Sequence, residues 1–201
     1  MKAQLVMDVI CVHSYLGYTR FARAAKRLRA EGVQVAVEFL PFELAPGAPA
    51  DGRPLLTVLE QTFGPQAVPD ALVFAEGIRL EYGKAIATGT FDAHRLIADA
   101  AHQDKAEPMA ERLFRAHFTD GLHIGDPATL ARLAAEVGVT TGHVPPTEVR
   151  ARLDHVRRLG ITGVPVLLIE NLPPLTGSHT ETKLLAALRQ AATTKGDHHD
   201  Q

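Results

Sequence analysis

The sequence contains a single cysteine, Cys11, within the tetrapeptide Cys11-Val12-His13-Ser14. A short apolar run ends just before it and a helical pattern follows, so Cys11 falls at a strand-to-helix junction. A thiol at a helix N-terminus meets the positive end of the helix macrodipole, which favours the thiolate. His13 can add positive charge or a hydrogen bond, and the Ser14 hydroxyl can exchange a hydrogen bond with the sulfur. The position predicts a nucleophilic thiol, although free cysteines also occur as small buried hydrophobic residues.

A second candidate lies far downstream, where Gly163-Val164-Pro165 directly precedes an apolar run typical of a strand. Proline is tolerated at the start of a strand. It is also the residue type that readily takes a cis peptide bond in a tight turn. The residues alone leave open whether Pro165 is a strand-capping proline or part of a cis-proline turn.

Composition excludes several classes of function. One cysteine cannot form an intramolecular disulfide. The 21 Lys and Arg residues are spread among 23 Asp and Glu residues, whereas a nucleic-acid binder shows a basic patch. No stretch approaches about 18 uninterrupted apolar residues, and the N-terminus lacks a signal-peptide core. We therefore expect a cytoplasmic protein that binds neither nucleic acid nor membrane, and no spacing of ligands predicts a metal site.

The elements that must position these residues begin with a β-α-β unit. Residues 3–10 are apolar and predict a buried strand, and residues 15–30 show helical periodicity. Residues 33–40 alternate between apolar and polar, which is typical of a half-buried strand. Two strands joined through a helix predict a parallel pair with a right-handed crossover.

A long helical block follows this unit. Residues 54–144 are expected to be helical throughout, with one segment over 71–82. The clearest segment covers 126–138, with Asp126 as the N-cap and Pro127 at the first helical position. About 90 residues exceed a crossover connection, so the block predicts a lid or subdomain of its own.

The last part predicts a helix, two strands and a final helix. Ser178 and Glu181 have capping-box spacing before that final helix. The order of elements predicts an α/β fold with helices on both faces of a sheet. The predicted division is a main domain over 1–53 and 145–192, the inserted block over 54–144, and a flexible tail over 193–201.

Together, these features resemble the thioredoxin-like superfamily, and more narrowly the DsbA-related FrnE group of thiol oxidoreductases. The similarity covers about residues 4–190, and TFDAHR with LFRAHFTDG is its most specific part. It implies a thioredoxin-like fold with a large helical insertion between the βαβ and ββα halves, and a cis Pro165 beside Cys11. The matching stretches are DVICVHSYLG (8–17), PFELAP (41–46), TFDAHR (90–95), LFRAHFTDGLHIGD (113–126), LARLAAEVGV (130–139), GITGVP (160–165) and Gly177.

The departures from the family pattern lie at the reactive residues. The group usually carries Cys-Pro-Trp-Cys, so Ser14 stands for the resolving cysteine and His13 for the tryptophan. A histidine there resembles the Cys-Pro-His-Cys of DsbA, where it supports the thiolate. Before the last helix, Gly177-Ser178-His179 replaces the usual Gly-Ala-Gln. The resemblance implies that the scaffold is retained while the redox pair is not.

The resemblance implies a monothiol oxidoreductase in which Cys11 is the nucleophile. The backbone of Val164 would pair with a peptide or with glutathione, and the helix start at Gly177, Ser178 and His179 would receive a carboxylate. No tightly bound cofactor is implied, and glutathione is the candidate co-substrate. The expected partner is a small thiol, disulfide or peptide.

Two other functions stay open. One is a glutathione-dependent isomerase or transferase, as in the related hydroxychromene-carboxylate isomerases and kappa-class glutathione transferases. The other is a non-catalytic protein that binds a ligand or partner. The natural substrate and the choice between monomer and homodimer also stay open. Asp92, His94 and Arg95 are expected to serve packing and to line the cleft.

Overall fold

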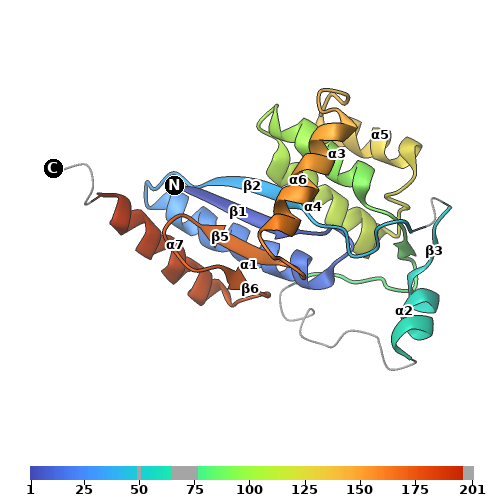
Figure 1. Cartoon of the computed structure of the whole chain (residues 1–201), viewed down its shortest axis with the longest axis horizontal. Coiled ribbons are helices and arrows are strands. Elements are labelled where there is room, and N and C mark those ends of the chain that lie inside the picture. The colour runs from blue at the N-terminus through green and yellow to red at the C-terminus, as the bar shows by residue number, and fades with distance from the viewer. Residues whose placement is uncertain (49–50, 65–76, 197–201) are drawn as a thin grey trace.

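A mixed four-stranded sheet with the order β2-β1-β5-β6 forms the centre of the protein (Figure 1). The computed structural model describes residues 1–48, 51–64 and 77–196. β2 is parallel to β1, β5 is antiparallel to β1, and β6 is antiparallel to β5. The predicted α/β architecture is confirmed. The strands are β1 (Lys2–Met7), β2 (Ala36–Pro41), β5 (Val166–Ile169) and β6 (Leu175–Thr176).

The helix α1 (Val12–Ala30) joins β1 to β2 and confirms the predicted β-α-β unit. It begins three residues earlier than expected, because Cys11 itself is the N-cap, with an extended backbone. β1 ends at Met7 rather than at Ile10, since a turn follows in which the Cys11 N–H donates to the Asp8 carbonyl at 3.0 Å. The cysteine therefore lies directly at the carboxyl end of a strand.

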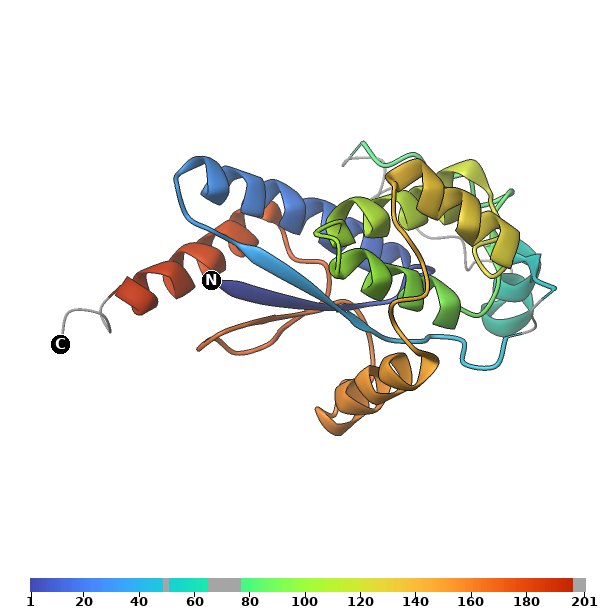
Figure 2. The same ribbon diagram turned by 90° about the horizontal axis from the view of Figure 1, so that it is seen from above.

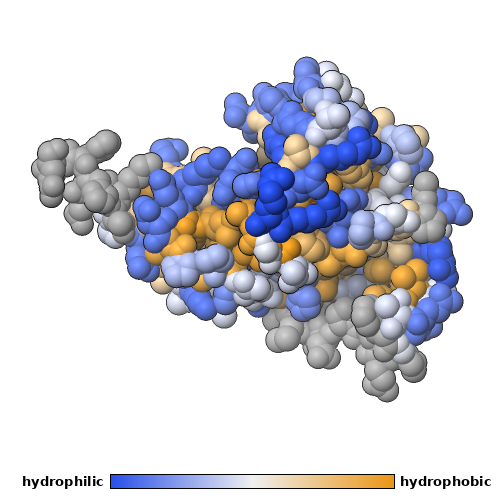
Figure 3. Space-filling view, viewed as in Figure 1, coloured by the Kyte–Doolittle hydropathy of each residue, from blue (hydrophilic) through white to orange (hydrophobic). Residues whose placement is uncertain are grey.

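Helices cover both faces of the sheet (Figure 2). α1 and α7 (Glu181–Gly196) pack against each other on one face, and α6 (Pro146–Arg158) lies on the other, against β2. Hydrophilic side chains gather over α6, and apolar surface remains between α6 and α7 (Figure 3). None of the helices in the described ranges is both long and apolar enough for a membrane span.

The region after β2 is less helical than its sequence predicts. The helix expected over 71–82 is not found at residues 77–82, and residues 71–76 lie outside the described residues. Gly77 has φ 73°, a left-handed conformation that interrupts a helix. A short antiparallel pair also forms, of β3 (Arg53–Pro54) with β4 (Ile86–Ala87). The helices are α2 (Leu55–Phe63), α3 (Phe91–Ala101), α4 (Ala106–Arg115), the π-helical turn η2 (Ala116–Asp120) and α5 (Pro127–Val137).

The start of α5 agrees with its sequence signals. Asp126 is the N-cap, and its side chain accepts a hydrogen bond from the Thr129 N–H at 2.8 Å. Pro127 occupies the first turn, and Gly138 ends the helix with φ 72°. Local signals were sufficient here because the cap and the terminating glycine lie within the segment itself.

The helical block shares the hydrophobic core of the main domain. Tyr15 on α1 stacks on Phe114 of α4, with ring centroids 4.9 Å apart, and Tyr18 contacts both Phe114 and Phe39 of β2. One cluster of buried residues includes side chains of β1, α1, α3, α4, α5 and α7. The block predicted as a subdomain thus packs directly against α1.

The last helix differs from expectation at both ends. The Oγ1 atom of Thr180 accepts from the Lys183 N–H at 3.3 Å, so Thr180, rather than Ser178, supplies the capping hydrogen bond. The helix begins at Glu181 and continues to Gly196, four residues into the segment predicted as a tail. The rest of that tail, 197–201, lies outside the described residues.

Candidate functional site

The pairing of β1 with β5 brings the two sequence candidates together. Val6 lies opposite Val166 in this antiparallel ladder, so the end of β1 and the start of β5 meet at one edge of the sheet. Cys11 follows β1, and Val164 and Pro165 precede β5. The predicted cis peptide bond is present between Val164 and Pro165. The Cys11 thiol donates a hydrogen bond to the Val164 carbonyl oxygen at 3.7 Å.

Burial determines the direction in which the pKa of the Cys11 thiol is shifted. Cys11 is only 8% exposed, and burial raises the pKa of its thiol. Hydrogen bonds from Ser14 lower this pKa, but the loss of solvent outweighs them, and the charge of Asp8 raises the pKa further. The prediction that the helix position favours the thiolate is therefore wrong for the structure as it stands, and the alternative of a buried cysteine agrees with it. Cys11 does lie at the N-terminus of α1, but the surrounding residues exclude solvent from its side chain.

Ser14 lies directly beside the sulfur. Its backbone N–H donates to Cys11 Sγ at 3.4 Å, and its hydroxyl oxygen accepts from the Asp8 N–H at 3.4 Å. Because the Ser14 oxygen accepts from Asp8, the hydroxyl hydrogen can donate to the sulfur. The Ser14 side chain accordingly lowers the pKa of the Cys11 thiol. The predicted contact between Ser14 and Cys11 is confirmed.

His13 contributes differently from its prediction. Its backbone lowers the Cys11 pKa, whereas its side chain is exposed. In the part of the chain that the structure describes, no hydrogen bond joins the imidazole to the sulfur. The side chain points into solvent because position 13 lies on the outer side of the first turn of α1.

The start of the last helix is close to the proline loop. A methyl group built on Gly17 of α1 would lie 3.0 Å from Pro165 Cγ and 3.7 Å from Ser178 Cα. Gly17 thus permits α1 to approach both segments. The Gly177 N–H donates to the Pro165 carbonyl at 2.8 Å and the His179 N–H to the Gly177 carbonyl at 3.1 Å. These two donors are used within the fold, so they are not available to a carboxylate as predicted.

Asp8 organises the floor of the site, a role that the sequence reasoning missed. Its Oδ2 accepts from the Leu44 N–H at 2.7 Å, and its Oδ1 lies 3.4 Å from Nε2 of His94. The same His94 nitrogen lies 2.9 Å from the Phe42 carbonyl oxygen. His94 therefore packs beneath the site, as its motif suggested. The sequence signal that could have pointed to Asp8 is an acidic residue directly after an apolar run typical of a strand.

Asp92 and Arg95 lie apart from this floor. They form an ion pair with each other on α3, at 3.2 Å. Both side chains are partly exposed and line a separate small hollow between α3 and α5. They do not contact Cys11, and the expectation that they line its cleft was wrong.

Two further side chains, His117 and Tyr82, carry buried polar atoms. Neither ring nitrogen of His117 nor the hydroxyl of Tyr82 has a hydrogen-bond partner among the described residues. Burial lowers the pKa of His117 to about 4, so the ring is neutral at pH 7. Burial, and to a lesser extent the charge of a Cys11 thiolate, raise the pKa of the Tyr82 hydroxyl. Within the described ranges, no three acidic, His or Cys side chains gather as metal ligands would.

Comparison with known proteins identifies relatives of this fold. A family model described as a DSBA-like thioredoxin domain matches residues 4–189. The structure of a probable DsbA oxidoreductase from Streptomyces coelicolor is similar with a TM-score of 0.81 and 27% sequence identity, covering 96% of this chain and 90% of that one. No curated protein sequence matches the chain.

Two more distant structures share the fold. The cytosolic disulfide reductase DsbM from Pseudomonas aeruginosa, solved with GSH, has a TM-score of 0.60 and 18% identity, covering 99% of this chain and all 100% of that one. A 2-hydroxychromene-2-carboxylate isomerase has a TM-score of 0.65 and 12% identity, covering 98% of each chain. The thioredoxin-like fold predicted from the sequence is confirmed.

Proposed function

The chain belongs to the DSBA-like thioredoxin domain family, and from that premise we propose that it is a FrnE-like thiol-disulfide oxidoreductase with one reactive thiol. Cys11 is the nucleophile and glutathione is the co-substrate. The substrate is a glutathionylated peptide or a small mixed disulfide. The lone cysteine and the cytosolic relative that was solved with GSH support a cytoplasmic, glutathione-linked enzyme.

The observation that carries this proposal is the contact between Cys11 Sγ and the Val164 carbonyl oxygen. This carbonyl lies beside the sulfur at the start of β5. A substrate with an extended backbone can donate its own N–H to the same oxygen. Such a donor would replace the hydrogen bond from the thiol and leave the sulfur free to react. Substrate binding would then release the thiol that burial holds protonated.

The reaction needs no second cysteine. The Cys11 thiolate attacks the glutathione sulfur of R–S–S–G, so a Cys11–S–S–G bond forms and R–S⁻ leaves. The leaving thiolate takes up the proton that Cys11 lost. A second glutathione thiolate then attacks the glutathione sulfur of this mixed disulfide, releasing the Cys11 thiolate and glutathione disulfide. The net reaction reduces R–S–S–G to R–SH and oxidises one glutathione.

The direct test is reduction of a glutathionylated peptide by the purified chain with excess glutathione. We expect turnover by the wild type and loss of turnover in Cys11→Ser. Ser14→Ala is expected to react more slowly because the sulfur loses a donor that stabilises the thiolate. Unchanged turnover in Cys11→Ser would refute the nucleophile, and no turnover at all would support a non-catalytic binding protein.

A second variant tests the geometry of the pair. Ser14→Cys restores the spacing of a dithiol, since Ser14 lies one helical turn from Cys11 with its N–H bonded to the sulfur. We expect oxidation of this variant to form a disulfide between Cys11 and the introduced thiol, with a gain in insulin reduction. The matched control is Thr19→Cys on the same helix, which lies two turns away. Absence of the disulfide would contradict a DsbA-like active-site geometry.

The burial of Cys11 favours one alternative, a glutathione-dependent isomerase. A protonated thiol beside the Ser14 hydroxyl can hold the thiolate of bound glutathione by hydrogen bonds without forming a disulfide. In that case glutathione supplies the nucleophile, and Cys11→Ser retains most activity on a small isomerisable substrate. Cys11→Ser therefore separates the two functions, because only the oxidoreductase depends on its sulfur.

A further inference from the structure

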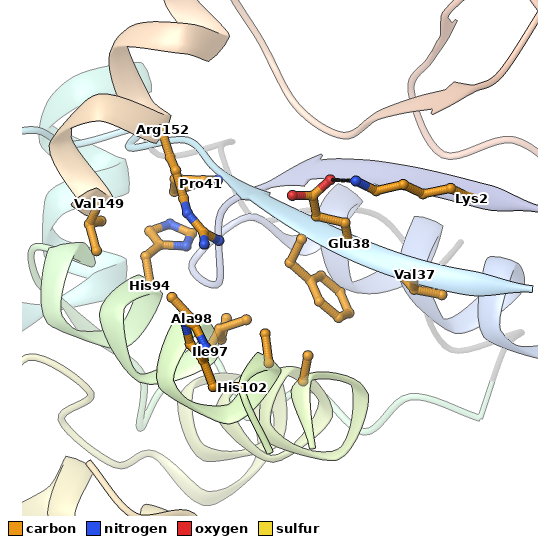
Figure 4. A pocket seen from close by; sticks show the side chains of 13 residues that line it. Lys2, Val37, Glu38, Pro41, His94, Ile97, Ala98, His102, Val149 and Arg152 are labelled. Atoms are coloured by element: carbon orange, nitrogen blue, oxygen red, sulfur yellow. Dashed lines mark ion pairs between the residues drawn. The ribbon is translucent and has the colours of Figure 1, made fainter. Parts of the chain in front are cut away.

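His94 reaches from α3 to the end of β2, beside Pro41 (Figure 4). Its side chain is only 3% exposed, and its Nε2 atom lies 2.9 Å from the Phe42 carbonyl oxygen and 3.4 Å from Asp8 Oδ1. Because a carbonyl oxygen can only accept, Nε2 carries the hydrogen and donates it to Phe42. The Asp8 carboxylate therefore lies next to an N–H group of the imidazole.

The Asp8 carboxylate has few partners for a buried group. Asp8 is 0% exposed, and its Oδ2 accepts from the Leu44 N–H at 2.7 Å. Its Oδ1 has no hydrogen-bond partner among the described residues. A buried charge without partners is costly. The partly positive N–H group of His94, at 3.4 Å, supplies compensation that Oδ1 otherwise lacks.

The backbone of Asp8 belongs to the turn that carries Cys11. Its carbonyl accepts from the Cys11 N–H at 3.0 Å, and its N–H donates to Ser14 Oγ at 3.4 Å. The backbone N–H of Ser14 in turn donates to the sulfur at 3.4 Å. The Asp8 side chain is thus close to the thiol, and its negative charge disfavours the thiolate.

The other charged groups around His94 come from the segment after β2 and from α6. Burial raises the pKa of the Glu43 carboxyl, a charge on His94 lowers it, and the charge of Asp8 raises it. Arg152 of α6 lines a groove together with His94, but it is paired with Glu148 at 2.6 Å. Because this arginine is bound to another carboxylate, the imidazole is the donor beside Asp8 Oδ1 in the described part of the chain.

We propose that His94 is a positioning residue for Cys11 and that it acts through Asp8. Its N–H group partly compensates the Asp8 carboxylate and so limits the repulsion between this charge and a Cys11 thiolate. This role deepens the proposed function, on which its effect on turnover rests. It gives the histidine of TFDAHR a part in thiol reactivity, beyond the packing expected from the sequence.

The test is the rate of Cys11 alkylation by iodoacetamide over a series of pH values. Asp8→Asn removes the charge but keeps an acceptor for the Leu44 N–H. We expect its pH midpoint to fall and alkylation at pH 7 to be about 3- to 10-fold faster than in the wild type. His94→Leu removes the donor but leaves the charge, so alkylation should be about 2- to 3-fold slower. Both variants lose a buried polar contact, so a merely structural role would move the two rates in the same direction.

Three further variants separate this role from others. His94→Gln keeps an N–H donor without the ring and should restore the wild-type rate. Exposed His102→Gln, at the end of the same helix, should leave the rate unchanged. In an Asp8→Asn background, His94→Leu should have no effect, because the histidine acts through the carboxylate. Shifts in the same direction in the two single variants, or an equal effect of His94→Leu in both backgrounds, would overturn the proposal.

A measurement on the wild type covers the case in which a variant does not fold. The imidazole ¹⁵N spectrum, with His94 assigned through its absence in His94→Gln, should show the hydrogen on Nε2. A hydrogen on Nδ1 alone would contradict the role of the N–H group. Turnover of a glutathionylated peptide should follow the alkylation rates. If the wild type shows no turnover while the alkylation rates shift as expected, the proposed function fails and the positioning role of His94 is supported.

Discussion

Cys11 is subject to opposing influences at the residue scale. The helix N-terminus and the Ser14 donors favour the thiolate, whereas burial and the charge of Asp8 favour the thiol. Burial has the largest effect, so the resting protein holds a protonated cysteine. Such a protonated cysteine differs from one that is reactive at all times. Its reactivity depends on a donor that displaces the Cys11 thiol from the Val164 carbonyl oxygen.

The first prediction concerns the alkylation of Cys11 by iodoacetamide as a function of pH. The rate is expected to rise with a midpoint above that of cysteine in an unstructured peptide, because burial raises the pKa of the thiol. Ser14→Ala should move the midpoint further upward by removing a donor to the thiolate. The measurement is the loss of free thiol over time. A midpoint below that of the peptide would contradict the dominance of burial.

His117 predicts an acid-dependent loss of stability. Its folded pKa is about 4, below the ordinary value of 6.5, so its contribution is complete above pH 6.5 and is lost as pH falls toward 4. Between pH 7.5 and pH 5 this residue should account for about 2 kcal/mol of the free energy of unfolding. Urea titrations at the two pH values measure the loss. His117→Phe should reduce it, and exposed His155→Gln should not.

At the scale of elements, a buried carboxylate ties α3 to the segment before α6. Asp99 is 2% exposed, and its two oxygens accept from the Gly142 N–H at 2.9 Å and the Val144 N–H at 2.7 Å. Gln103, one turn later, exchanges two hydrogen bonds with the backbone of Thr140. These contacts hold the loop that leads into α6, and thereby the spacing of the two helices beside β2.

Removing the Asp99 carboxylate should therefore destabilise the protein. Asp99→Leu leaves the Gly142 and Val144 N–H groups buried without acceptors, and we expect a loss of about 2–4 kcal/mol in the free energy of unfolding. Asp99→Asn retains one acceptor oxygen and should lose less. Asp92→Asn, on the exposed side of the same helix, serves as the control. Equal stability of Asp99→Leu and the control would show that the loop is held by other contacts.

At the scale of the whole molecule, the main sheet and the inserted helices share one core. Tyr15 and Tyr18 of α1 stack on Phe114 of α4, so these rings join the two parts of the chain. Burial of a common apolar surface couples the stability of the parts that bury it. We therefore expect the block to unfold together with the sheet.

The corresponding prediction is a single cooperative unfolding transition. Tyrosine fluorescence reports the joint between α1 and α4, since the chain has three tyrosines and no tryptophan. Circular dichroism reports the helices throughout. In urea, the two signals are expected to give the same midpoint and slope. Separate midpoints would indicate that the inserted helices unfold as the independent subdomain predicted from their length.

The sequence by itself determined the local features of this protein. The β-α-β unit, the capped helix beginning at Pro127, and a cysteine at the end of the first strand each depend on neighbouring residues. The motifs also identified the family, with TFDAHR and LFRAHFTDG as the most specific part of the resemblance and GITGVP as the proline segment. Glycines that interrupt helices, such as Gly77, were harder to judge, because a single glycine inside a helical pattern is often tolerated.

Tertiary structure alone decided what surrounds those residues. The pairing of β1 with β5 joins Cys11 to Val164 across more than 150 positions, and the exposed fraction of Cys11 follows from segments that pack over it. Burial, and so the direction of the pKa shift, is a property of all the atoms near the sulfur. The contact of His94 with Asp8 likewise depends on how α3 packs beside β2. Periodicity describes one segment at a time, so neither feature could be derived from it.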